Sequence, residues 1–146
     1  METKKILVPV NGKSVDDEVV KLACNLAKKS KAKVDVVNII EVERSLSLDT
    51  PVDSEADKAE GILGHAEDVA HETNYEVETD LIQAREAGPA IVDTAKERKT
   101  DLIVMGTGYK KHLGVFALGK TISHILKEAP CQILLYRGFL SKDNSK

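Results

Sequence analysis

The chain has few aromatic residues, few cysteines and no long apolar run. Aromatic residues make up 3% of its 146 residues and tryptophan is absent, so a hydrophobic core must be built from aliphatic side chains. Two cysteines are too few for a disulfide framework, and no segment approaches the roughly 20 apolar residues of a membrane-spanning helix. The first residues run into strand-like sequence without the apolar region of a signal peptide. These features predict a cytoplasmic protein with one domain, residues 1–146, and no membrane partner.

An excess of positive charge is also absent. The formal net charge is −3 at pH 7, which argues against nucleic acid as a partner. Positive charge is instead concentrated late in the chain, where seven lysines and arginines follow residue 105 against two acidic residues. This uneven distribution favours a local binding site for an anion.

Short apolar runs alternate with segments of helical periodicity along the chain. The predicted strands cover residues 6–10, 34–40, 77–82, 102–105 and 132–136. The predicted helices cover about residues 15–29, 54–73, 88–98 and 119–128. A variable loop is expected at about 41–53, with Ser45, Ser47 and Thr50 as residues whose modification the sequence leaves open, and a flexible tail at about 138–146.

This alternation predicts an α/β fold with a single doubly wound, parallel, five-stranded sheet. The expected type is flavodoxin-like, with strand order 3-2-1-4-5 and four helices on two faces. In such sheets, ligands bind outside the carboxyl ends of the strands, where the strand order reverses. The candidate binding loops therefore begin at Asn11, Glu41 and Gly106.

The loop after the fourth predicted strand is rich in glycine, which lets backbone N–H groups approach an anion. The helix that follows adds the unpaired donors of its N-terminus. Residues 114–121 match the Walker A pattern G-x-x-x-x-G-K-T. A P-loop follows its strand directly, whereas this pattern begins eight residues after Gly106. Only one helix and one strand remain downstream, so no later strand is left to carry the metal-binding Asp. We therefore reject a P-loop NTPase. Lys120 still offers a cation and Thr121 a hydroxyl at a helix N-terminus.

Two stretches resemble a known family. Residues 101–107 (DLIVMGT) and 129–135 (APCQILL) are similar to the corresponding stretches of universal stress proteins, and the resemblance covers nearly the whole chain. It implies ATP or a related adenine nucleotide as ligand, with room for Mg²⁺ beside Thr121, and a role in stress response. No nucleophile is visibly paired with a base in the sequence, so we expect slow ATP hydrolysis at most and assign no catalytic residue.

Nucleotide-binding members of this family use the motif G-x-x-G-x9-G-(S/T), whose amides and hydroxyl contact the phosphates. In this chain the motif begins at Gly106, but Tyr109 stands at the second glycine and Lys120 at the Ser/Thr position. Asn11 replaces the family's acidic residue after the first strand. The resemblance thus implies these nucleotide-binding residues: Pro9, Val10, Asn11, Ile39, Gly106, Thr107, Gly108, Gly119, Lys120 and Thr121.

These departures leave two functions open. Asn11 can still form hydrogen bonds, and Lys120 adds a charge-assisted contact to phosphate, whereas Tyr109 removes a glycine from the loop. The alternative is a dimeric interaction module of the same family that has lost nucleotide binding. A homodimer through the last strand is expected in either case, because the family commonly pairs this apolar edge with its copy. The expected interface residues are Ile133, Leu134, Leu135 and Tyr136.

Overall fold

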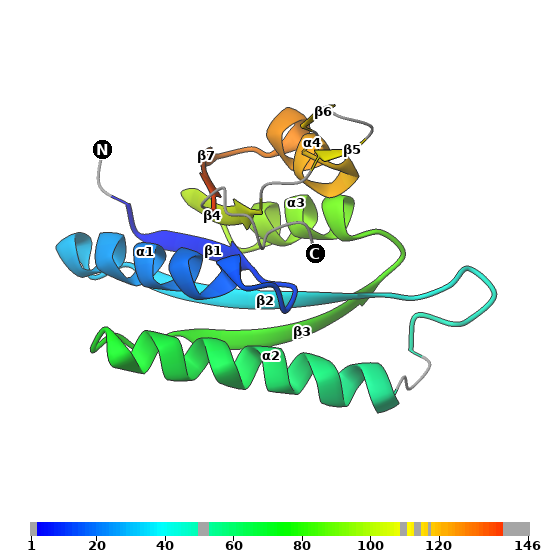
Figure 1. The fold of residues 1–146 in the computed structure, drawn as a ribbon, viewed down its shortest axis with the longest axis horizontal. Helices are drawn as coiled ribbons and strands as arrows, with labels where there is room; N and C mark the ends of the chain where they lie inside the picture. Colours follow the sequence, from blue (N-terminus) through cyan, green and yellow to red (C-terminus); the bar gives the residue numbers. More distant parts are fainter. Residues whose placement is uncertain (1–2, 50–52, 109–110, 113–114, 117, 139–146) are drawn as a thin grey trace.

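The chain folds around a parallel sheet (Figure 1). The computed structural model describes residues 3–49, 53–108, 111–112, 115–116 and 118–138. Within this part of the chain, the sheet consists of β1 (Lys5–Pro9), β2 (Lys33–Glu41), β3 (Glu78–Ala84), β4 (Leu102–Thr107) and β7 (Gln132–Arg137). The strands lie in the order β3-β2-β1-β4-β7. Since β7 is the fifth strand of this sheet, the predicted strand order is confirmed.

Helices cover both faces of the sheet. Among the described residues they are α1 (Val15–Ser30), α2 (Asp53–Glu72), α3 (Ala87–Glu97) and α4 (Lys120–Glu128). Ile6 and Val8 of β1 belong to the core that α1 and α2 cover, whereas Leu7 between them belongs to the core under α3 and α4. Both faces are buried, and this explains why the central strands are continuous apolar runs. No helix in the described ranges is long and apolar enough to cross a membrane.

The segment between β4 and α4 differs from the prediction of a plain glycine-rich loop. It contains two short strands, β5 (Lys111–His112) and β6 (Val115–Phe116), which pair antiparallel as a separate sheet. Two-residue strands are too short to show periodicity, so the sequence did not reveal them. Tyr109 and the predicted tail from residue 139 onward lie outside the described residues.

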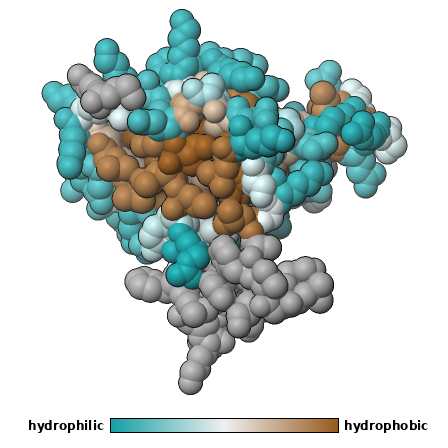
Figure 2. All heavy atoms as spheres, turned by 90° about the horizontal axis from the view of Figure 1, so that it is seen from above, coloured by the Kyte–Doolittle hydropathy of each residue, from teal (hydrophilic) through white to brown (hydrophobic). Residues whose placement is uncertain are grey.

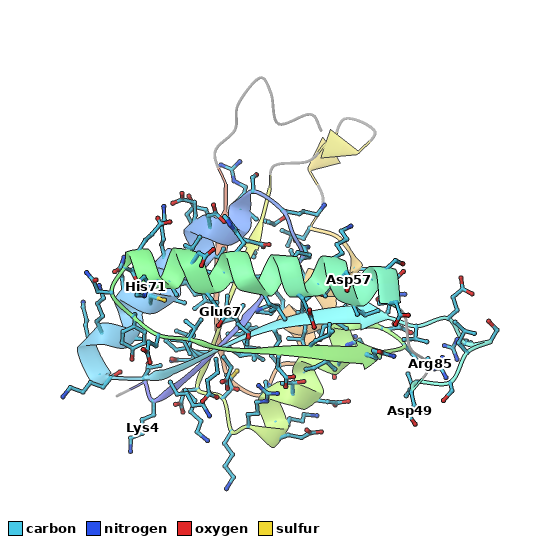
Figure 3. The ribbon with its side chains drawn as sticks, turned by 90° about the horizontal axis from the view of Figure 1, so that it is seen from below. Lys4, Asp49, Asp57, Glu67, His71 and Arg85 are labelled. Carbon is cyan, nitrogen blue, oxygen red and sulfur yellow. The ribbon has the colours of Figure 1, made fainter. Side chains whose placement is uncertain are left out.

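The connection between β2 and α2 projects beyond the end of the sheet (Figures 1 and 3). Two side chains hold this connection: Nε2 of Gln83 in β3 donates to the carbonyl of Leu48 at 2.7 Å, and Arg85, directly after β3, donates to the carbonyl of Val42. Figure 3 places Arg85 and Asp49 at this same end of the molecule. The projection falls in the predicted variable loop, where Ser45 and Ser47 are exposed, and Thr50 lies outside the described residues.

Candidate functional site

A cavity of about 540 Å³ lies beyond the carboxyl ends of β1 and β4. Its wall also includes the first residues of α3 and α4 and one residue of β2. In a sheet of order β3-β2-β1-β4-β7 the strand order reverses at β1 and β4, so the cavity occupies the expected ligand position. Its volume falls within the roughly 300–1,000 Å³ that is typical of small-molecule sites.

The cavity brings together residues that are far apart in the sequence. Of the residues implied by the resemblance, Gly108 lies outside the cavity lining. The others line it: Pro9, Val10, Asn11, Ile39, Gly106, Thr107, Gly119, Lys120 and Thr121. Tyr109, the departure at the motif's second glycine, is not among the described residues.

The end of β1 is fixed to β2 by two hydrogen bonds. The N–H of Val10 donates to the carbonyl of Val37 at 2.9 Å, and Asn38 Nδ2 donates to the carbonyl of Val10 at 2.7 Å. Asn38 is buried, so its amide replaces the water that this carbonyl would otherwise need. Both polar backbone groups of Val10 are therefore paired within the protein, so the wall that Pro9 and Val10 form needs no ligand to hold it in place.

Asp16 is a cavity residue that the sequence analysis did not single out. Its Oδ2 accepts the backbone N–H groups of Asn11 at 3.2 Å and Gly12 at 2.7 Å, which folds the first turn of α1 over the β1–α1 loop. Burial raises the pKa of the Asp16 carboxyl, although the N–H groups that it accepts act in the opposite direction. The sequence feature that could have revealed Asp16 is its position five residues after Asn11, because a side chain in the first helical turn can contact the loop before the helix.

The start of α4 contributes polar groups and positive charge. Gly119 precedes the helix with φ 87° and ψ 168°, a conformation that is essentially restricted to glycine. Lys120 and Thr121 follow as the first two residues of α4, at the end where the helix dipole is positive. The Lys120 side chain is 85% exposed, and its Nζ lies 3.5 Å from Oε2 of Glu86. This arrangement can stabilise an anion at the cavity.

Apolar side chains make up much of the remaining wall. Ile39 of β2 and Met105 of β4 lie in it, and α3 and α4 add side chains that the sequence analysis did not single out. These additional residues are Ala87, Ile91, Ile122 and Ile125, together with Leu118 before α4. An apolar wall with a few polar groups suits a ligand that has a flat apolar part and a charged part.

The described residues do not fit a metal ion held by the protein alone. They contain no group of three or more His, Cys, Asp or Glu side chains that could hold one. In the cavity, Oδ2 of the Asp16 carboxylate already accepts two loop N–H groups, and the Thr121 hydroxyl is a weak ligand. A Mg²⁺ ion at this cavity would therefore depend on oxygen atoms of the ligand.

Comparison with known proteins identifies the family. The model of the universal stress protein family matches residues 2–137. The chain belongs to the universal stress protein family. A universal stress protein of Methanocaldococcus jannaschii is 32% identical over 140 residues, which cover 92% of this chain and 82% of that protein.

Solved structures of universal stress proteins share the fold. The one from Archaeoglobus fulgidus in complex with dAMP has a TM-score of 0.74 and 23% identity, covering 92% of this chain and 98% of that chain. A universal stress protein in complex with cAMP has a TM-score of 0.73 and 18% identity, covering 92% and 97% of the two chains. The family and the doubly wound α/β fold expected from the sequence are both confirmed.

Proposed function

We propose that this universal stress protein binds ATP or a related adenine nucleotide in the cavity at the ends of β1 and β4. The observation that carries the proposal is the convergence of Lys120, the N-terminus of α4 and the fixed β1–α1 loop on one partly apolar cavity. Structures of the same fold in complex with dAMP and cAMP support an adenine nucleotide as the ligand class. The protein would act in stress response through its bound state rather than as a fast enzyme.

The cavity wall suggests how such a ligand would lie. The adenine ring would pack among apolar side chains such as Ile39 and Met105, where its flat surface leaves water. The ribose hydroxyls would meet Asn11, whose side chain can both donate and accept hydrogen bonds. The phosphates would bind the backbone N–H groups at the start of α4 and the Lys120 amino group. Any Mg²⁺ would be carried by the phosphates, with Thr121 nearby.

The alternative of an interaction module without nucleotide binding is less favoured. A protein that had lost its ligand would have no need for a cavity of about 540 Å³ with a lysine at its rim and a loop held by Asn38 and Asp16. Concave sites with a few convergent polar groups are the usual form of a small-molecule site, so the cavity favours the nucleotide-binding function. Binding measurements decide between the two functions.

Lys120→Ala tests the proposed phosphate contact. We expect this change to weaken ATP binding by about 1–2 kcal/mol, roughly a 5- to 30-fold rise in Kd, because a charge-assisted hydrogen bond is lost at a partly screened position. Isothermal titration calorimetry measures the change. Lys127→Ala is the matched control, since Lys127 lies in the last turn of the same helix.

Each outcome of this experiment has a definite meaning. Equal ATP affinity in Lys120→Ala and the wild type would remove Lys120 from the site. Absence of binding by AMP, ADP and ATP, together with an unchanged melting temperature at millimolar nucleotide, would contradict the proposed function. Any ligand that binds the folded state alone must raise stability by mass action.

We further propose that the protein is a homodimer through β7. This strand is at the edge of the sheet. Its Leu134 is 36% exposed, and Leu126 of α4 is 44% exposed. Figure 2 shows a hydrophobic face on the side of the molecule where β7 and α4 lie. An apolar edge strand is prone to pair with another chain, and a symmetric dimer would cover it.

A further inference from the structure

We infer that Glu86 sets the phosphate preference of the nucleotide site by opposing negative charge at its rim, so that it disfavours ATP more than AMP. The inference rests on the proposed nucleotide binding and goes beyond it by naming a residue that selects among adenine nucleotides. Glu86 is not itself in the cavity lining, but its neighbour Ala87 and its ion-pair partner Lys120 both are.

Glu86 is positioned for this role by its place before α3. It is the residue before the helix, with an extended backbone (φ −141°, ψ 139°), and in the described structure its side chain does not cap the helix. That capping contact comes from Glu41 at the end of β2, whose Oε2 accepts the N–H of Ala87 at 2.9 Å. The Glu86 carboxylate is therefore available to reach the start of α4, where Oε2 lies 3.5 Å from Lys120 Nζ.

Packing between the two helices brings the backbones of Glu86 and Lys120 near each other. Gly88 in the first turn of α3 lies against His124 of α4, and a Cβ atom added at position 88 would be 3.1 Å from the His124 Cβ. The close approach brings the N-termini of α3 and α4 to the same cavity. The Glu86–Lys120 pair thus joins the residue before α3 to the first residue of α4, across two helices that pack closely.

In the ligand-free protein, the Glu86 carboxylate occupies the position of an anion beside Lys120. A phosphate that contacts Lys120 must share the lysine with this carboxylate or displace the carboxylate. A phosphate oxygen about 2.8 Å from the amino group would lie within about 6 Å of the Glu86 oxygen, which is less than the Debye length of roughly 8 Å at physiological salt. Repulsion is therefore only partly screened, and it grows with the number of phosphates on the ligand.

The experiment compares AMP, ADP and ATP binding to the wild type and to Glu86→Gln by isothermal titration calorimetry at constant ionic strength. Glutamine keeps the size of the side chain and removes its charge. We expect Glu86→Gln to raise ATP affinity about two- to fivefold, ADP affinity less and AMP affinity least, the scale of one exposed charge pair. Glu97→Gln is the matched control, because Glu97 is an exposed acidic residue at the opposite end of α3 and should leave all three affinities unchanged.

A second arm repeats the comparison in the Lys120→Ala protein. Part of the Glu86 effect arises from competition for Lys120, so the gain in ATP affinity should be smaller there than in the wild-type background. Unchanged affinities in Glu86→Gln, or an equal gain for AMP and ATP, would each overturn the inference while nucleotide binding stands. An equal gain in both backgrounds would overturn the competition between Glu86 and phosphate for Lys120. Failure of all three nucleotides to bind any of the proteins would overturn the proposed function as well.

Discussion

Gly106 is a glycine because α1 packs directly against the end of β4. A Cβ atom at this position would overlap with Cγ2 of Val19 and lie 3.0 Å from Cγ2 of Val15, and both valines are buried on α1. We expect Gly106→Ala to lower the free energy of unfolding by about 1–3 kcal/mol, the usual cost of overpacking, as measured by urea denaturation. The loss should shrink in a Val19→Ala background, where the methyl groups are gone. An equal loss in both backgrounds would contradict this explanation.

The partly buried carboxyl of Asp16 should make the free energy of unfolding depend on pH. Burial raises the pKa of its carboxyl above the ordinary 3.8, so the folded protein binds this proton more tightly than the unfolded chain. The resulting stabilisation is complete below pH 3.8 and is lost as the pH rises through the folded pKa. Asp16→Asn removes this titration.

We therefore expect the free energy of unfolding of the wild type, relative to that of Asp16→Asn, to fall as the pH rises above about 4. Urea denaturation of both proteins at a series of acidic to neutral pH values measures the difference. Glu18→Gln serves as a comparison, because Glu18 is an exposed acidic residue in the same helical turn. Parallel pH profiles of the wild type and Asp16→Asn would show that the carboxyl has the same pKa in the folded and unfolded states.

At the scale of elements, the sequence predicts those helices and strands whose apolar pattern results from burial in the core. Strands such as β4 are continuous apolar runs because helices cover both of their faces, and this pattern can be read without a structure. The β5–β6 pair was missed because its pairing involves two residues on each strand. The cap of α3 was also out of reach, since Glu41 contacts Ala87 across 46 positions of sequence.

At the scale of the whole molecule, topology explains why most of the candidate site could be predicted. Once a doubly wound sheet is inferred, the carboxyl ends of β1, β2 and β4 must face one region, which brings Asn11 and Lys120 to the same cavity. The parts that sequence reasoning missed depend on side-chain packing between elements. Asp16 reaches back onto its own loop, and Glu86 reaches α4 because α3 and α4 pack closely.

The predicted homodimer is also a property of the whole molecule, because it joins two sheets at their β7 edges. Leu134→Lys places a charge on this edge, where pairing with a second copy would have to bury it, so we expect the dimer to dissociate into monomers. Multi-angle light scattering at micromolar concentration measures the mass. Leu48→Lys is the control, since Leu48 is 44% exposed on the projecting β2–α2 connection and should leave the dimer intact. A wild-type protein that is monomeric at this concentration would contradict the dimer and leave the proposed nucleotide binding untouched, because one chain forms the cavity alone.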